Sequence, residues 1–214
     1  MTLPELALQA VYGRLAWAVV LAALLIALLP QAWRRSRALV PGLLCGAVLA
    51  MLLPGPASPA WWLGLALQYP SGLLTFLCLV FLHARWLGRP AGAVLPLPLA
   101  ATLALAGAVL YLDAIGYLAL GVYYAGFGPL AAPVLAVLGV AGCALLLMRG
   151  QGGPGYVALL CALLLFCLLR LPTGNLWDAL LDPLLWAWAL ASLARRAVRG
   201  LMPARGAERH IFIK

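Results

Sequence analysis

Charged side chains are scarce in this sequence of 214 residues: only 9% are Asp, Glu, Lys or Arg, and only five are acidic. A soluble domain usually carries about 25% charged residues. The hydrophobic share is 66%, and the mean hydropathy is +1.08. These values predict an all-α, polytopic integral membrane protein with no soluble domain, because each transmembrane helix takes about 20 apolar residues.

Sequence motifs of catalysis and metal binding are also missing. The chain has no P-loop, no H-E-x-x-H and no G-x-S-x-G. Its two histidines, His83 and His210, are too few for the usual metal or haem site. The five cysteines form no C-x-x-C pair and lie in apolar runs, where a thiol acts as a small apolar side chain. These absences favour a non-catalytic protein without a cofactor.

Basic residues consist of thirteen arginines and one lysine, and the net charge is +9. The arginines are divided among short loops and a tail, which is the distribution that orients membrane proteins rather than one that binds nucleic acid. The expected partners are membrane lipid and either other membrane subunits or further copies of the chain. A composition rich in Arg, Ala, Leu, Gly and Pro is typical of GC-rich bacterial genomes, so the expected location is the bacterial inner membrane.

Apolar runs predict about seven transmembrane helices, with six as the alternative. The first run ends at Pro30 without a small-residue cleavage site, so we interpret it as a retained helix rather than a signal peptide. The expected spans are 15–29, 38–53, 61–82, 93 to between 112 and 122, 130–148, 156–169 and 176–193. Residues 1–194 then form a helical bundle and 195–214 a basic cytoplasmic tail.

Arginine positions orient this bundle. With seven alternating spans, eleven of the thirteen arginines fall on one side, which the positive-inside rule assigns to the cytoplasm. Only Arg14 and Arg170 fall on the other side. The expected topology is therefore N-terminus out and C-terminus in.

Spans three and four are expected to be broken or kinked. Pro70 and Gly72 interrupt span three shortly after Gln68, because proline removes a backbone hydrogen bond and glycine weakens a helix. The run over 91–148 is too long for one helix, and its prolines and glycines are the expected points of interruption. On the second span, Gly42 and Gly46 have the spacing of a helix-packing face.

A candidate binding site at the outer end of the bundle combines polar residues from several spans. Ionisable groups at membrane depth are costly and usually face a protein interior or a wet cavity. The candidates are Gln68, Asp113, Arg170, Asp178 and Asp182.

Structural roles compete with ligand binding at these positions. Asp178 stands three residues after Asn175, as in a capping box. Asp113 lies in a wet loop if span four ends early, and Arg170 is placed to form an ion pair with Asp182. Because Asp182 lies beyond the helix cap, we expect it to be the most consequential acid.

Three interpretations of function remain open. The first is a non-catalytic inner-membrane protein, either a small transporter or an envelope-assembly subunit, with a polar pocket open to the outer leaflet. Broken helices often form such sites in transporters. The second is an intramembrane enzyme that uses Asp113 with Asp178 or Asp182 as an acid–base pair. The third is a purely structural subunit of a larger complex.

Overall fold

The computed structural model describes residues 3–30, 33, 36–89 and 94–201. This part of the chain is 75% helix without strands, which confirms the all-α class. The long helices are α1 (Leu6–Leu28), α2 (Leu39–Met51), α4 (Gly72–Trp86), α5 (Leu97–Ala114), α7 (Ala131–Met148), α8 (Pro154–Leu169) and α10 (Pro183–Leu201). The short ones are η2 (Gly55–Ala57), α3 (Pro59–Leu67), α6 (Val122–Ala125) and α9 (Leu176–Leu180).

Three helices in the described ranges are long and apolar enough to cross a membrane: α1, α5 and α7. They have 23, 18 and 18 residues, or about 34, 27 and 27 Å at 1.5 Å per residue. A bilayer core is about 30 Å thick. The apolar helices α2, α4 and α8 are shorter. Length and composition are therefore compatible with a membrane location.

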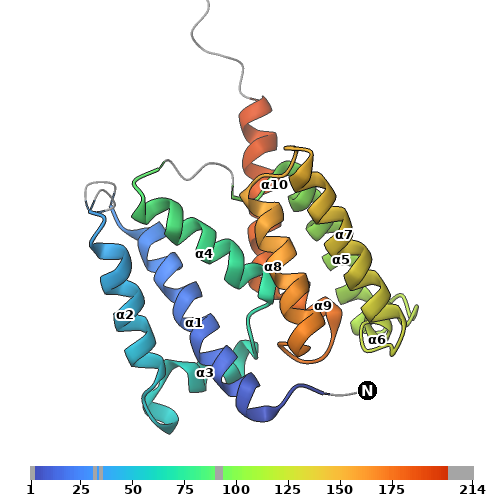
Figure 1. Cartoon of the computed structure of the whole chain (residues 1–214), viewed down its shortest axis with the longest axis horizontal. Helices are drawn as coiled ribbons and strands as arrows, with labels where there is room; N and C mark the ends of the chain where they lie inside the picture. The colour runs from blue at the N-terminus through green and yellow to red at the C-terminus, as the bar shows by residue number, and fades with distance from the viewer. Residues whose placement is uncertain (1–2, 31–32, 34–35, 90–93, 202–214) are drawn as a thin grey trace, which may run out of the picture.

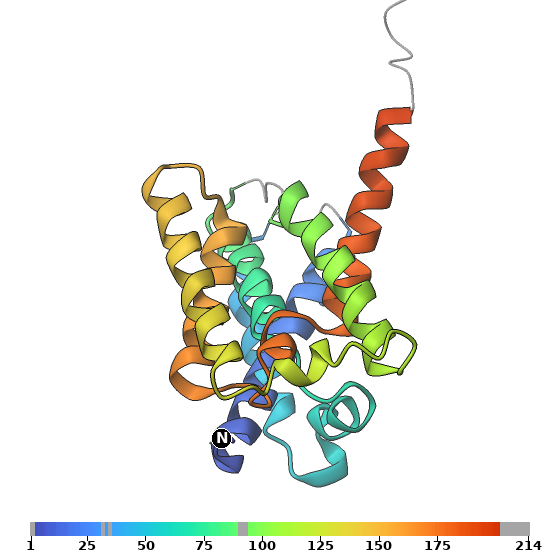
Figure 2. The same ribbon diagram turned by 90° about the vertical axis from the view of Figure 1, so that its right-hand side faces the viewer.

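The long helices alternate in direction. In Figure 1 the chain ascends along α1, α4, α7 and α10 and descends along α2, α5 and α8. The segments η2, α3, α6 and α9 consequently lie together at the lower end, which Figure 2 also shows. We call this the acidic end, because Asp113, Asp178 and Asp182 lie in or beside these segments. The opposite end, which holds the connection after Met148 and the last turns of α10, is the basic end.

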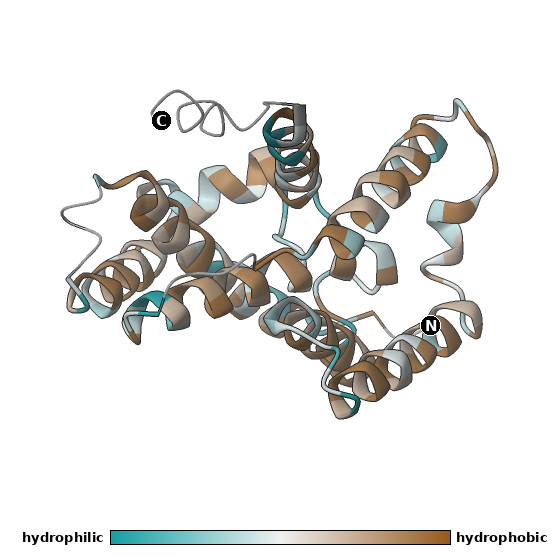
Figure 3. Ribbon diagram, turned by 90° about the horizontal axis from the view of Figure 1, so that it is seen from above, coloured by the Kyte–Doolittle hydropathy of each residue, from teal (hydrophilic) through white to brown (hydrophobic). Residues whose placement is uncertain are grey.

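Neighbouring helices pack through small residues. α1 lies against α2 and α4, α8 lies between α4 and α7, and α5 pairs with α10. Figure 3 shows these helices from above, and hydrophobic residues predominate along them. Where α5 meets α10, the ring of Trp186 covers Gly107 and leaves no room for a Cβ. Its indole Nε1 donates to the Ala104 carbonyl at 3.0 Å. By contrast, Gly42 and Gly46 on α2 face open space, so the packing predicted there does not occur among the residues that the structure describes.

The predicted interruption between Gln68 and Gly72 is confirmed. α3 ends at Leu67, Gln68 turns the chain at φ 59° and ψ −124°, and α4 begins at Gly72. Ser71 caps α4, because its Oγ accepts a hydrogen bond from the Leu74 N–H at 3.1 Å. The turn is sharper than a kink: α3 lies across the acidic end instead of continuing α4 (Figure 1).

Span four was expected to be interrupted, but α5 is continuous from Leu97 to Ala114. The expected end of the span between 112 and 122 is confirmed. α5 ends at Ala114, inside the expected window, and α6 is a single turn within the connection to α7. Gly116 and Gly121 adopt φ of +80° and +71°, a region that glycine enters without steric cost. These glycines let the chain reverse at the acidic end.

The prediction of one continuous helix over 176–193 is wrong. α9 ends at Leu180, and α10 begins at Pro183. Proline disfavours the helical conformation of the residue before it, here Asp182, and is itself favoured at the first position of a helix. α10 then continues to Leu201, so the first residues of the predicted tail are helical. The remaining tail, 202–214, lies outside the described residues, as do Arg34 and Arg35.

Candidate functional site

The acidic end contains a cavity of about 210 Å³ between the α3–α4 break, the end of α5, α6 and the α8–α10 connection. Three of the five predicted binding residues line it: Gln68, Asp178 and Asp182. Asp113 is not among the lining residues, although the adjacent Ala114 is. Arg170 is not part of the lining.

Asp113 organises the loop that follows α5. Its carboxylate accepts hydrogen bonds from the backbone N–H groups of Leu120 at 2.6 Å, Gly121 at 2.9 Å and Tyr123 at 2.9 Å. The side chain is 6% exposed, and Asp113 belongs to the last turn of α5 rather than to the loop that follows. Both oxygens are engaged by backbone donors, which gives Asp113 a structural role.

Asp182 joins the beginnings of two helices. One carboxylate oxygen accepts from the N–H of Ser71 and the other from the N–H of Leu185, both at 2.8 Å. Asp182 therefore caps α10, and it also binds the residue that caps α4. The side chain is 7% exposed, and each oxygen accepts a hydrogen bond from a peptide group.

The predicted ion pair between Arg170 and Asp182 is not formed in the described part of the chain. Arg170 ends α8 in the left-handed conformation, at φ +57°. Its guanidinium carbon lies 5.1 Å from the ring centroid of Phe166, one turn earlier on the same helix. A cation–π contact of this kind stabilises the charge without a carboxylate.

Asp178 differs from these two acids because its carboxylate accepts from side-chain hydroxyls. Thr173 Oγ1 donates at 2.6 Å, and the Tyr123 hydroxyl donates to both oxygens, at 3.2 and 3.4 Å. The predicted capping box is therefore only half correct. The Asn175 side chain does cap α9, by accepting from the Trp177 N–H at 2.9 Å, but Asp178 faces the cavity.

Burial controls the ionisation of this cluster in the connecting segments α6 and α9. It raises the pKa of Asp178 above its usual value, and the Thr173 and Tyr123 hydroxyls oppose that shift. Burial, together with the nearby Asp178 carboxylate, raises the pKa of Tyr123 to about 12. Tyr123 therefore remains a neutral hydrogen-bond donor to Asp178 at neutral pH.

A set of contacts between α6 and α9 holds this cluster in place. Asn175 Nδ2 donates to the Tyr123 carbonyl at 3.2 Å, and Trp177 Nε1 donates to the Val122 carbonyl at 2.8 Å. Gly126 lies so close to the side chains of Asn175 and Trp177 that a Cβ there has no room. Thr173 and Tyr123 are not among the residues predicted from the sequence, since their contribution depends on the tertiary packing of α6 against α9.

Helix α1 binds the backbone of two segments that contribute to the cavity, the α3–α4 break and the α8–α10 connection. The Tyr12 hydroxyl donates to the Pro70 carbonyl at 2.8 Å, and Trp17 Nε1 donates to the Gln68 carbonyl at 3.0 Å. Gln9 Nε2 donates to the Pro172 carbonyl at 2.8 Å. These bonds satisfy backbone carbonyls that the chain interruptions leave without helical partners.

The chemistry available here is hydrogen bonding and charge attraction by the Asp178 carboxylate, with Asp182 also in the wall, in a cavity lined by Tyr69, Tyr111, Tyr123 and Trp177. Among the residues that the structure describes, no three His, Cys, Asp or Glu side chains group into a metal site. No family model, curated protein or solved structure matches this chain.

Proposed function

We propose that this protein is a multi-pass protein of the bacterial inner membrane with about seven transmembrane helices, its N-terminus outside and its C-terminus in the cytoplasm. The alternating directions of the long helices support this topology (Figure 1). Arg37, Arg89 and Arg149 lie in connections at the basic end, as a cytoplasmic face requires. Reporter fusions after Arg37, Arg89, Gln151 and the C-terminus should all report the cytoplasm, and a periplasmic signal from any of them contradicts the topology.

Within this topology, we propose a non-catalytic role in which the acidic-end cavity binds a small solute or head group that carries an amine. The observation that carries this proposal is the Asp178 carboxylate, which faces a cavity with Asp182 in its wall and no Lys, Arg or His in its lining. Tyr111 and Trp177 also line it. A carboxylate beside aromatic rings favours an ammonium group by charge and by cation–π attraction.

Such binding fits a small transporter or an envelope-assembly subunit better than an aspartate-pair enzyme. Catalysis by two carboxylates requires both to reach one substrate. Asp113 and Asp182 instead accept hydrogen bonds from backbone N–H groups through both oxygens. The open face of α2 at Gly42 and Gly46 supports membership of a complex.

A thermal-shift measurement on the purified full-length protein tests the binding role. Ethanolamine and choline serve as amine probes, and glycerol and glucose as hydroxyl probes. We expect an amine to raise the Tm of the wild type and of the control Glu5→Gln, which changes an exposed acid at the same end. The Tm of Asp178→Asn should be the same with and without an amine.

Three outcomes contradict the proposal. They are an equal shift in Asp178→Asn, a response to glycerol or glucose alone, and no response of the wild type to either amine. A pull-down in mild detergent then distinguishes a complex subunit, which retains partner membrane proteins, from a transporter that works alone.

A further inference from the structure

Helix α1 carries an arginine at the acidic end that the topology does not explain. Arg14 lies in the third turn of α1, near the segments that hold the acids. Its side chain is exposed, and within the described residues it forms no ion pair and no side-chain hydrogen bond. The positive-inside rule places arginines at the opposite end, so Arg14 is not accounted for as an orientation signal.

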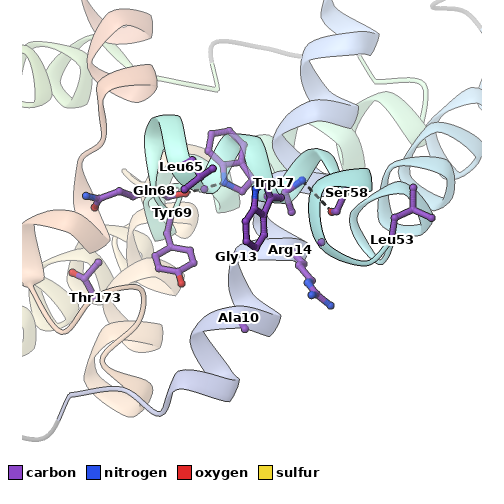
Figure 4. A pocket seen from close by; sticks show the side chains of 14 residues that line it. Ala10, Gly13, Arg14, Trp17, Leu53, Ser58, Leu65, Gln68, Tyr69 and Thr173 are labelled. Carbon is purple, nitrogen blue, oxygen red and sulfur yellow. Dashed lines mark hydrogen bonds between the residues drawn. The ribbon is translucent and has the colours of Figure 1, made fainter.

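Arg14 lines a second cavity of about 450 Å³, between α1, η2, α3 and the α3–α4 break. Figure 4 shows Arg14, Gly13 and Trp17 on α1, with Tyr69 from the break beside them. The two cavities share Gln68, Tyr69 and Thr173 in their walls.

The wall beside Arg14 is held by specific contacts. The Tyr69 ring packs so closely on Gly13 that a Cβ there would lie 2.6 Å from two ring atoms. Trp17 is fixed by its bond to the Gln68 carbonyl. Ser58 donates to the Met51 carbonyl at 3.0 Å and accepts from the Ala60 N–H at 3.2 Å. These contacts define the shape of the cavity wall on the side of α1 and α3.

This cavity and the one at Asp178 differ in the charge of their lining residues. Arg14 is the charged residue of its lining, and no acid lines it. A guanidinium without a carboxylate partner favours an anion, and its planar donors match the oxygens of a phosphate.

Apolar side chains next to Arg14 indicate what carries that phosphate. Trp61 and Leu65 of α3 line the cavity and are 50% and 70% exposed, and the neighbouring Trp62 is 60% exposed. Tryptophans gather at the level of lipid head groups, and the exposed leucine offers a surface for acyl chains. We propose that this cavity binds the phosphate-bearing head group of an anionic phospholipid, with Arg14 as the phosphate ligand.

Binding of phosphatidylglycerol to the delipidated full-length protein in mild detergent, followed by native mass spectrometry, tests this proposal. The comparison variants are Arg14→Gln, Arg14→Lys and Arg149→Gln; the last removes an exposed arginine at the basic end. Loss of one hydrogen-bonded charge should weaken binding roughly tenfold in Arg14→Gln. Arg14→Lys should fall in between, and Arg149→Gln should bind as the wild type does.

Controls distinguish a lipid site at Arg14 from a free-phosphate site and from general attraction of anions to arginine. Since Arg14 is exposed, all variants should keep the wild-type Tm within about 2 °C. Equal binding by Arg14→Gln, or an equal loss in Arg149→Gln, overturns the proposal. Full competition by inorganic phosphate points to a free-phosphate site and overturns the assignment to lipid. The proposal is independent of amine binding, because Asp178→Asn should retain phosphatidylglycerol.

Discussion

Asp182 accepts a hydrogen bond from the backbone N–H of Ser71 at 2.8 Å, across 111 positions of sequence. Because the same carboxylate also caps α10 through Leu185, one side chain aligns the beginnings of α4 and α10. This contact holds the α3–α4 break next to the α9–α10 break. Both breaks contribute residues to the lining of the Asp178 cavity.

Replacement of this carboxylate should destabilise the fold more than replacement of its neighbour. Asp182→Asn leaves one buried backbone donor facing an amide N–H₂ group, at a cost of about 1–3 kcal/mol. Asp178→Asn keeps an acceptor for the Thr173 and Tyr123 hydroxyls and should be milder. The Tm of each variant in detergent measures the difference, and a larger loss in Asp178→Asn contradicts this assignment.

The Arg170 contact with Phe166 leads to a related prediction. Since Arg170 does not pair with Asp182, the effects of Arg170→Gln and Asp182→Asn should add within about 0.5 kcal/mol, as expected for sites without a shared contact. The Tm of the double variant tests additivity. Partial recovery in the double variant would restore the ion-pair interpretation.

Asp113 should slow the hydrogen exchange of backbone amides in the loop after α5. In Asp113→Ala, the amides of Leu120, Gly121 and Tyr123 lose their acceptor, so their hydrogen exchange should accelerate. The backbone of α7 should be unaffected. Unchanged protection of the three amides in the variant would show that Asp113 does not hold the loop.

The Asp178 pKa predicts a pH dependence of stability. A carboxyl with a raised pKa in the folded state contributes stability that is fully present below its unfolded pKa of about 3.9 and is lost as the pH rises through the folded value. Asp178→Asn removes this dependence. As the pH rises through that window, the Tm of the variant should therefore increase relative to the Tm of the wild type. The control Glu5→Gln should not show this gain, and a constant difference between Asp178→Asn and the wild type would contradict the predicted ionisation.

Composition and chain breakers account for much of this architecture. The all-α class, the interruption after Gln68 and the end of α5 all follow from apolar run length and from the positions of proline and glycine. The rule that proline interrupts a helix also applies to Pro183, but the apolar residues on both sides of it favoured one continuous helix.

The roles of the acids were less predictable, since they depend on which backbone donors the fold brings to each carboxylate. Asn175 is recognisable as a helix cap because its partner is local. Ser71 lies far from Asp182 in sequence, and Thr173 and Tyr123 meet Asp178 only after α6 packs on α9. Gln68, Asp178 and Asp182 do line one cavity, whereas Asp113 and Arg170 stabilise the surrounding chain.

Cysteine accessibility tests most directly whether the Asp178 cavity opens to the outside. Ala114 lines the cavity and is exposed, so Ala114→Cys on a background without native cysteines should react with a membrane-impermeant maleimide in intact spheroplasts. Arg149→Cys, at the basic end, should react only after permeabilisation. Labelling of Arg149→Cys in intact spheroplasts, with Ala114→Cys protected until permeabilisation, would contradict the proposed orientation and place the cavity on the cytoplasmic side.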